Sequence, residues 1–282
     1  MTEKIKIGEI NTLRIDRDSD HGLFLMDEEE NSVLLPNAYV HEDMKIGDNI
    51  DVFVYKDSQD REIATTLRPI AKVNEFALMR VTDSAPFGAF VDWGLPKELL
   101  VPKKMQKNPL EIGKNYIIFV TLDEQTNRVV GDTRIGRYLN HDPKQMKELK
   151  EVDLLIIAKT PLGYKAIVNN RFEGMLYHNE LYTKLNIGQT CKGYVKKVRD
   201  DGKFDLSLNP IGKAKHQQDT EKIIELLKTN NNTLPFTYKS EASQISEMFG
   251  MSKKSFKKAL TTLIQEDKIV LNENSITVKS SS

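Results

Sequence analysis

Phe87-Gly88-Ala89-Phe90-Val91-Asp92 is the stretch that decides the fold of this chain. Its residues alternate with a period of two, which is typical of a half-exposed β-strand. Working outward along the chain, the sequence predicts one strand-like run that opens at 71–73 and continues at 77–81, strands at 99–102 and 116–120, a turn at 123–128, and a last strand from Val129. Five short strands with one longer turn-rich link predict a small closed barrel of the OB type.

The same pattern occurs three times. In each copy two glycines stand 25 residues apart, and a third marker falls 14 residues after the first glycine. The glycine pairs are Gly22 and Gly47, Gly88 and Gly113, and Gly163 and Gly188, and the third markers are Pro36, Pro102 and Tyr177. An isoleucine precedes the second glycine every time. Three copies in register indicate one small β module used three times, and such chains usually bind something extended.

The β pattern stops after Leu208, and helical patterns follow. The predicted elements are a helix capped by Asp219, a helix at about 241–249 capped by Ser240 and ended by Gly250, a helix at 253–266 capped by Ser252, and a hairpin at 268–278. Three helices and a terminal hairpin predict a winged helix.

We therefore expect a mainly β chain with a C-terminal α+β domain: three tandem five-stranded OB-type barrels followed by a winged helix. The expected bounds are 1–68, 69–138 and 152–210 for the barrels, 139–151 and 211–218 for linkers, and 219–282 for the winged helix. The segment 139–151 contains Pro143 and a run rich in Lys and Glu, so both a helical and a flexible spacer stay open.

The third copy resembles a known domain. Its segment Glu173-Gly174-Met175-Leu176-Tyr177-His178-Asn179-Glu180-Leu181 and its closing Leu206-Ser207 resemble the S1 RNA-binding domain, and the second copy matches at Phe87 to Val91. The first copy is the most diverged. Where the S1 pattern has a histidine, the three copies have Pro36, Pro102 and Tyr177. The order of three S1-like modules and a winged helix resembles the conserved virulence factor B family. That resemblance implies an RNA-binding, post-transcriptional regulator in a bacterial cytoplasm.

Candidate nucleic-acid-binding residues are aromatic side chains, which stack on unpaired bases, and cations, which contact phosphates. The aromatic candidates are Phe87, Phe90, Tyr164 and Tyr177, with His178 adjacent. The basic candidates are Arg80, Lys97, Lys103 and Lys104 in the second copy, Lys165, Arg171, Lys192, Lys196, Lys197 and Arg199 in the third, and Lys253, Lys254, Lys257 and Lys258 on the last helix. The alternatives are that Phe90 is a core residue and that the lysine runs are solvated faces.

Phe87 and Phe90 are three residues apart, so they point to different sides of a regular strand. A bulge or turn at Gly88 is expected to bring both rings to one surface. Phe24 holds the equivalent place in the first copy, and we expect it to be structural.

Charge is unevenly distributed along a chain whose formal net charge is zero. Residues 1–68 hold 8 Lys and Arg against 16 Asp and Glu, whereas residues 69–282 hold 33 against 25. Nucleic acid is repelled by the first region and attracted by the second. We therefore expect the second and third modules, with the winged helix, to bind single-stranded RNA. The acidic first module is expected to be a spacer or a protein-docking face.

The sequence predicts no catalytic residue, metal site or cofactor. It has no phosphate-cradling glycine loop, and its five histidines are scattered. The one cysteine, Cys191, is expected to be a structural thiol, and the absence of a signal peptide or membrane span predicts a cytoplasmic protein. Two other classes stay open: a DNA-binding transcription factor that uses the winged helix, and a protein-interaction scaffold. The oligomeric state is open as well.

Overall fold

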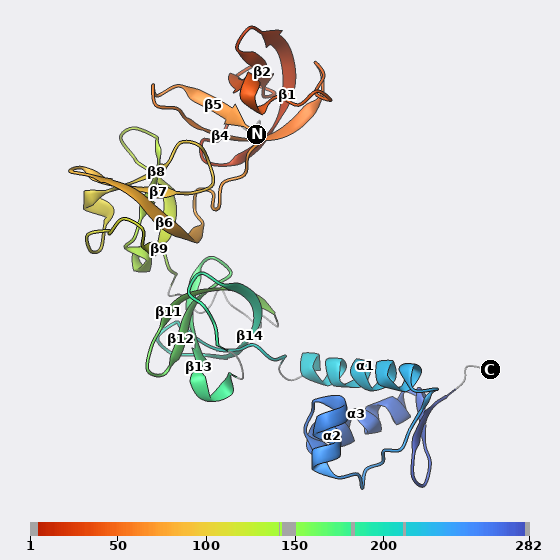
Figure 1. Cartoon of the computed structure of the whole chain (residues 1–282). Coiled ribbons are helices and arrows are strands. Elements are labelled where there is room, and N and C mark those ends of the chain that lie inside the picture. Colours follow the sequence, from red (N-terminus) through yellow and green to blue (C-terminus); the bar gives the residue numbers. More distant parts are fainter. Residues whose placement is uncertain (1–4, 141, 143–150, 182–183, 211–212, 280–282) are drawn as a thin grey trace. The chain divides into compact units, whose positions relative to one another are not determined.

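The computed structural model describes residues 5–140, 142, 151–181, 184–210 and 213–279 (Figure 1). Three five-stranded β domains, here called barrels 1, 2 and 3, precede a helical domain with a small sheet. The predicted fold class is therefore confirmed. By its contacts the chain divides into two compact units, 1–141 with 154–173 and 184–190, and 142–153 with 174–183 and 191–282. No helix in the described ranges is long and apolar enough to cross a membrane.

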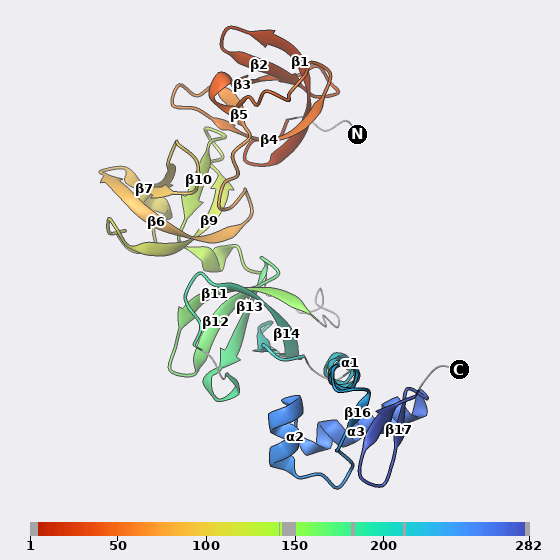
Figure 2. The same cartoon turned by 45° about the vertical axis from the view of Figure 1, so that its right-hand side comes forward.

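Barrel 1 is closed, with strand order β1-β2-β3-β5-β4 (Figure 2). Its strands are β1 (Ile10–Ser19), β2 (Gly22–Met26), β3 (Ser32–Pro36), β4 (Asn49–Lys56) and β5 (Glu62–Thr65). The parallel contact of β3 with β5 closes the barrel. Alternate residues such as Leu23, Leu25, Val33 and Leu35 fill its core, as a period of two requires.

Barrel 2 has the same order but is closed less completely. Its strands are β6 (Phe76–Ala85), β7 (Gly88–Asp92), β8 (Leu99–Pro102), β9 (Asn115–Leu122) and β10 (Val129–Asp132). They form a sheet in the order β10-β9-β6-β7-β8. The edge strands β8 and β10 still lie against each other. Gly131 of β10 is so close to Val101 of β8 that a Cβ added to Gly131 would lie 2.9 Å from Val101 Cγ2. The predicted opening of the first strand at 71–73 is wrong: these residues form a bend and turn before β6.

Barrel 3 is closed in the same order as barrel 1. Its strands are β11 (Val152–Lys159), β12 (Gly163–Val168), β13 (Phe172–Tyr177), β14 (Thr190–Val198) and β15 (Phe204–Ser207). Most of the segment 139–151, expected to be a spacer, lies outside the described residues.

The 14-residue spacing is a hairpin register. Gly22 faces Pro36 across β2 and β3, and Gly88 faces Pro102 across β7 and β8. A side chain at Gly88 would collide with the backbone, since a Cβ there would lie 2.6 Å from the carbonyl oxygen of Val101. Glycine is therefore required by the close approach of the two strands.

The second glycine of each copy holds a β-bulge in the first strand. The register of the first strand shifts just after Ile15, Val81 and Ile156. The N–H groups of Gly47, Gly113 and Gly188 donate to the carbonyl oxygens of these three residues, at 2.8, 2.8 and 2.7 Å. The N–H groups of the same three residues donate to the carbonyl oxygens of Asp48, Lys114 and Gln189. We call this pair of hydrogen bonds the bulge clamp.

The turn that contains the second glycine of each copy, here called the clamp turn, requires a left-handed backbone conformation. The φ angles of Gly47, Gly113 and Gly188 are 96°, 83° and 86°, a region that side chains disfavour. The isoleucines before them, Ile46, Ile112 and Ile187, are exposed.

The hydrophobic core of barrel 2 extends into barrel 1. The ring of Trp93 in barrel 2 meets Phe53 and Tyr55 of barrel 1 at centroid distances of 5.6 and 6.3 Å. The N–H of Val73 donates to the carbonyl oxygen of Gly8 at 2.9 Å, which joins the two backbones. The first two modules are therefore one packed body.

A second junction joins barrel 2 to parts of barrel 3 in the same compact unit. Asn170 accepts from the N–H of Phe76 at 3.0 Å and donates to the carbonyl oxygen of Asn74 at 2.6 Å. Leu78 packs against Gly188 so closely that a Cβ there would overlap it. The clamp turn of barrel 3 is thus seated on β6.

The C-terminal domain is the predicted winged helix. It contains α1 (Lys213–Thr229), β16 (Thr233–Leu234), α2 (Ala242–Phe249), α3 (Lys253–Gln265), β17 (Ile269–Leu271) and β18 (Ile276–Val278). The cap at Ser252 is confirmed, because its Oγ accepts from the N–H of Ser255 at 3.2 Å. Gly250 ends α2 in the left-handed conformation, as expected.

Two predicted caps are wrong. Asp219 lies inside α1 and is nearly buried, so the helix already covers 213–218, where a linker was expected. Ser240 does not cap α2: the residue before that helix is Glu241, and the Ser240 hydroxyl accepts from the N–H of Thr237 instead. A polar residue near a helix start was not enough to identify the cap in either case.

The close approach at Gly88 predicts a stability difference between two glycines. Gly88→Ala is expected to lower the free energy of unfolding by about 1–3 kcal/mol, because the new methyl group overlaps the backbone of β8. Gly136→Ala is the control, since no atom lies within 4 Å of a Cβ there; its effect should stay within about 0.5 kcal/mol. Urea unfolding of both variants checks this. Equal effects would contradict the steric argument.

Candidate nucleic-acid interface

Phe87 and Phe90 form an aromatic pair on the surface of barrel 2. Phe87 lies in the turn before β7 and is 61% exposed, while Phe90 lies within β7 and is half-buried. Their ring centroids are 6.0 Å apart and the ring planes make 89°. The bulge in β6, between Val81 and Asp83, lies opposite Phe90. The expectation that both rings share one surface is confirmed, and Phe90 is not a core residue.

A pocket of about 280 Å³ opens beside this pair, and we call it the interbarrel pocket. Both barrels line it. Barrel 2 and its loops supply Phe87, Phe90, Trp93, Lys97, Glu98, Leu99, Leu100, Arg128, Val129 and Val130, and barrel 1 supplies Tyr55, Lys56 and Ser58. The pocket therefore combines aromatic and aliphatic walls with three cations.

The cations of the pocket are held by contacts that cross between the barrels. Lys97 Nζ donates to the carbonyl oxygen of Lys56 at 2.7 Å, and Lys56 Nζ donates to that of Thr126 at 2.9 Å. Arg128 Nε donates to Asp60 Oδ1 at 2.8 Å. Burial, and then repulsion by Arg128, lower the pKa of Lys97. The lower pKa of Lys97 therefore comes first from its burial, and the carboxylates of Asp57 and Asp60 oppose the shift.

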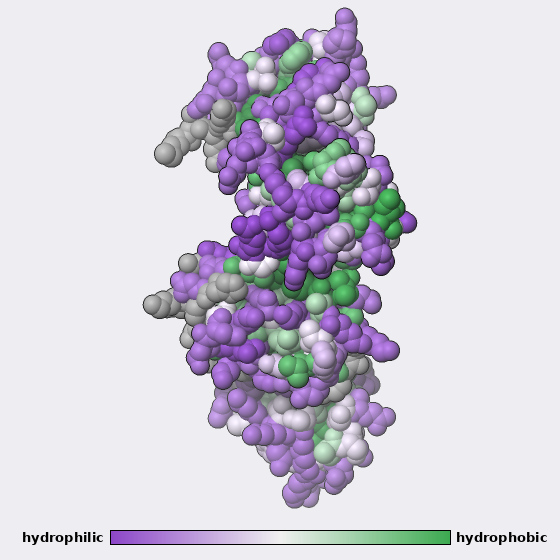
Figure 3. All heavy atoms as spheres, turned by 90° about the vertical axis from the view of Figure 1, so that its left-hand side faces the viewer, coloured by the Kyte–Doolittle hydropathy of each residue, from purple (hydrophilic) through white to green (hydrophobic). Residues whose placement is uncertain are grey.

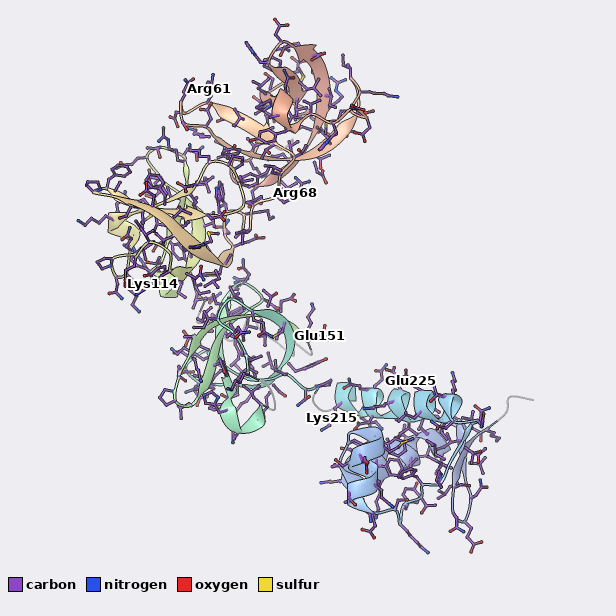
Figure 4. The ribbon with its side chains drawn as sticks, in the orientation of Figure 1. Arg61, Arg68, Lys114, Glu151, Lys215 and Glu225 are labelled. Atoms are coloured by element: carbon purple, nitrogen blue, oxygen red, sulfur yellow. The ribbon has the colours of Figure 1, made fainter. Side chains whose placement is uncertain are left out.

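The turn between β4 and β5 forms the barrel 1 side of this region. Arg61, labelled in Figure 4, belongs to that turn and pairs with Asp57 at 2.7 Å. Asp57 also accepts from the N–H groups of Gln59 and Arg61, which ties the turn together. Sequence reasoning missed the contribution of barrel 1, because Lys56 and Ser58 lie in a module whose overall charge is strongly negative.

The other candidates of barrel 2 lie outside the pocket. Arg80, Lys103 and Lys104 are exposed, and Lys104 pairs with Asp123 at 3.4 Å. The backbone N–H of Lys103 donates to the carbonyl oxygen of Phe87 at 2.9 Å. Lys103 therefore helps to place the Phe87 turn through its main chain.

In barrel 3 the two tyrosine candidates are less exposed than Phe87. Tyr164 is 4% exposed, so its ring is not available to a base and its prediction as a stacking residue is wrong. Tyr177 is half-buried, and its hydroxyl donates to Asp205 at 3.0 Å. This hydrogen bond raises the pKa of Tyr177. His178 is exposed next to it.

Most candidate cations of barrel 3 have acidic partners. Lys165 pairs with Glu173, Lys192 with Asp153, Lys196 with Glu180, and Arg199 with Asp201, and Figure 4 labels Glu151, a further partner of Lys192. The Arg171 guanidinium lies 5.5 Å from the Phe172 ring centroid. Lys197 is exposed, and no ion pair is recorded for it within the described residues. The positive field of barrel 3 is thus weaker than its lysine count indicates.

In barrel 1 the equivalent aromatic is covered. Phe24 is half-buried, and the Arg17 guanidinium lies 4.2 Å from its ring centroid. This cation–π contact occupies one face of the ring. The expectation that Phe24 is structural agrees with this contact.

The last helix of the winged helix carries a basic face. Lys254, Lys257 and Lys258 are exposed on α3, while Lys253 is half-buried with its Nζ 3.4 Å from the carbonyl oxygen of Lys239. The opposite side of α3 is buried in the core of the domain.

In the view of Figure 3 the surface is mostly hydrophilic with separate apolar patches, and the exposed apolar side chains of the chain include Phe87.

Asp132 anchors a buried polar cluster beside the pocket strand β10. It is fully buried and accepts hydrogen bonds from Arg134 Nη2 at 2.6 Å and from the Tyr138 hydroxyl at 2.8 Å. Burial opposes ionisation of Asp132, but the bonds from Arg134 and Tyr138 outweigh it and lower the pKa. Burial and the bond to Asp132 raise the pKa of Tyr138 to about 12.

No three His, Cys, Asp or Glu side chains in the part of the chain that the structure describes are arranged to hold a metal ion. Cys191 is half-buried, and burial raises the pKa of its thiol. A raised pKa leaves less of the reactive thiolate, which agrees with a structural thiol.

Comparison with known proteins identifies two of the domains and the family of the chain. Residues 7–67 match the model of the S1 domain, and residues 221–278 match that of the CvfB-like winged helix domain. The Bacillus subtilis protein YitL is 30% identical over 274 residues, which cover 95% of this chain and 92% of YitL. Conserved virulence factor B of Staphylococcus saprophyticus is 26% identical over 83% of this chain and 81% of that protein. This chain belongs to the conserved virulence factor B family.

The CvfB family relationship assigns nucleic-acid-binding domains to the chain at both ends. The S1 match falls on barrel 1, the copy that the sequence showed as most diverged. A crystal structure of a multidomain protein with nucleic acid binding domains from Streptococcus pneumoniae aligns over 97% of this chain and 99% of that one. Its sequence identity is 23% and its TM-score is 0.41.

The Asp132 cluster predicts a pH-dependent stability. Because folding lowers the pKa of Asp132, its contribution is complete above the ordinary value of 3.8 and is lost as the pH falls through the lower folded value. Asp132→Asn is expected to cost about 2 kcal/mol at neutral pH, with the difference from wild type shrinking as the pH falls below 3.8. Urea unfolding across this range measures it. A constant difference at every pH would show that the charge plays no part.

Proposed function

We propose that this protein binds single-stranded RNA, without catalysing a reaction on it, and acts as a post-transcriptional regulator in the cytoplasm. The observation that carries the proposal is the Phe87–Phe90 pair beside the cations of the interbarrel pocket. Aromatic side chains next to a positive groove are the combination that single-stranded nucleic acid requires, since every base offers a flat face. The S1 and winged-helix matches point to the same ligand class.

Single strands are favoured over duplexes by the position of these rings. The faces of paired bases are hidden in the stack, whereas an unpaired base can lie against Phe87, whose side chain is 61% exposed. The two rings lie nearly perpendicular to each other, so a base stacked on one ring meets the edge of the other.

Phosphate contacts come from cations on several domains in this proposal. Lys97 and Arg128 lie at the pocket, Lys103 and Lys197 are exposed on barrels 2 and 3, and the winged helix adds its basic α3 face. Barrel 3 contributes through its cations and Tyr177 rather than through Tyr164. Such contacts carry no base preference, so they favour binding of many sequences.

A second candidate is duplex DNA binding by α3. Its exposed lysines favour this function, because the third helix of a winged helix can enter the major groove. No Arg or Asn accompanies them on α3, although these are the side chains that read bases in bidentate fashion. Preference of the intact chain for duplex DNA over single strands would move the function to this domain.

Removing the aromatic pair is expected to weaken RNA binding without unfolding the chain. Phe87→Ala with Phe90→Ala should cost about 1–3 kcal/mol, or roughly 5- to 150-fold in Kd, through lost stacking. Fluorescence anisotropy of a labelled single-stranded RNA measures the affinity. Phe24→Ala is the matched control in barrel 1, because Arg17 already covers that ring. An unchanged affinity in a folded double variant would show that the pair does not stack on RNA.

The winged helix is expected to contribute salt-sensitive contacts. Replacing Lys254, Lys257 and Lys258 with alanine should weaken binding about equally for all RNA sequences, because phosphates carry no base information. The slope of log K against log salt should fall by about one for each lysine that contacts phosphate. Titrations at several salt concentrations check this. An unchanged slope would remove α3 from the interface.

A further inference from the structure

We infer that barrel 1 is part of the nucleotide site rather than a spacer. One base of the bound strand enters the interbarrel pocket, between the Phe87–Phe90 pair and the β4–β5 turn of barrel 1. The inference rests on the proposed RNA binding and adds to it a second wall, which comes from the acidic module. That module was expected to be a spacer or a protein-docking face.

The first support is that barrel 1 supplies both apolar and charged parts of the wall. The ring of Tyr55 packs against Trp93, which closes the back of the pocket. The side chain of Lys56 is only 15% exposed, so its ammonium group is held close to the protein surface. Ser58 is exposed where the turn borders the pocket. Barrel 1 therefore brings a lysine and a tyrosine to the pocket, although Asp60 of the same turn pairs with Lys56 and with Arg128.

The second support is that the two walls are held together before any ligand binds. Trp93 packs between residues of both barrels, and three cross-barrel side-chain contacts surround the pocket: Lys97 to Lys56, Lys56 to Thr126, and Arg128 to Asp60. A preformed site avoids the entropy cost of ordering two domains around the ligand. Barrel 1 can thus contribute to affinity without a conformational change.

The third support is the chemistry of the lining. Leu99, Val129 and the aromatic rings offer an apolar surface for the faces of a flat ring. Lys97 Nζ donates to a backbone carbonyl, and an ammonium group has three donors, so Lys97 can still meet an anion. Lys56 Nζ donates to a backbone carbonyl as well, but it also lies 3.7 Å from Asp60 Oδ1. A flat apolar ring joined to an anion is a nucleotide. Glu98 at the same pocket can accept a hydrogen bond from an exocyclic amino group.

The size of the pocket restricts what enters it. Its volume of about 280 Å³ lies at the lower end of the range of small-molecule sites. It admits one ring system, whereas a duplex or a folded peptide element is too large. The ligand of this pocket is therefore a single unpaired nucleotide of a longer strand.

The test adds the same charge at two exposed serines of barrel 1. Ser58 borders the pocket, and Ser32, on the β2–β3 hairpin, does not line it. Ser58→Glu is expected to raise the Kd of an eight-nucleotide single-stranded RNA about fivefold, by repulsion of the nearest phosphate. Ser32→Glu changes the net charge of the barrel equally and should stay within about twofold, because salt screens distant charges.

A variant of opposite charge at the same position distinguishes an electrostatic effect on binding from a loss of folding. Ser58→Lys should tighten binding about as much as Ser58→Glu weakens it, a gain that loss of structure cannot produce. Trp93 is the one tryptophan of the chain and lines the pocket, so its intrinsic fluorescence reports whether the pocket is occupied. Its emission should change with the same midpoint as the anisotropy of the labelled RNA.

The outcomes separate this inference from the proposed function. If the wild-type protein binds no single-stranded RNA, both are wrong. If it binds RNA, loses affinity with the double Phe variant, but shows a silent Trp93 and equal affinities for Ser58→Glu and Ser32→Glu, only the role of barrel 1 is overturned. A pocket-specific charge effect together with a Trp93 signal supports it.

Discussion

The bulge clamp is the constraint on which the three barrels depend. It bends the first strand so that it can pair with β-strands on both sides of a small barrel. It also sets which residue lies just beyond the bend: Phe24, Phe90 and Lys165 face Arg17, Asp83 and Ala158 immediately after the bulges. The same position of the module is therefore an aromatic covered by arginine in barrel 1, an uncovered aromatic in barrel 2, and a lysine in barrel 3. The same geometry yields three surfaces of different chemistry.

The repeat was visible in the sequence because its markers are geometric necessities. The 14-residue spacing is a strand register, and the clamp glycine has a backbone that other residues disfavour, so both persist where side chains diverge. The position of Tyr164 relative to the first glycine of its copy was enough to exclude it as a stacking residue. Phe90 lies two residues after the first glycine of its copy and Tyr164 only one, so the two side chains point to opposite faces of their strands.

Other features could not be predicted from one copy at a time. The shared core joins Trp93 to Phe53 and Tyr55, which belong to different modules, and no periodicity relates them. The ion pairs of barrel 3 likewise link residues such as Lys192 and Asp153 that only the fold brings together. Two of the three predicted helix caps failed for local reasons: α1 already begins at Lys213, so Asp219 lies within the helix, and the Ser240 hydroxyl accepts from the N–H of Thr237 instead of capping α2.

The seating of the barrel 3 clamp turn on Leu78 makes the order of the modules part of the design. Leu78 lies three residues before the bulge, and the same position holds Thr12 in barrel 1 and Asp153 in barrel 3. Thr12 is bonded to Asp51 and Asp153 to Lys192, so neither offers an apolar seat. Of the three equivalent residues, only Leu78 of barrel 2 is apolar. The copies are interchangeable in fold but not in sequence order, and a chain with its barrels shuffled would lose this junction.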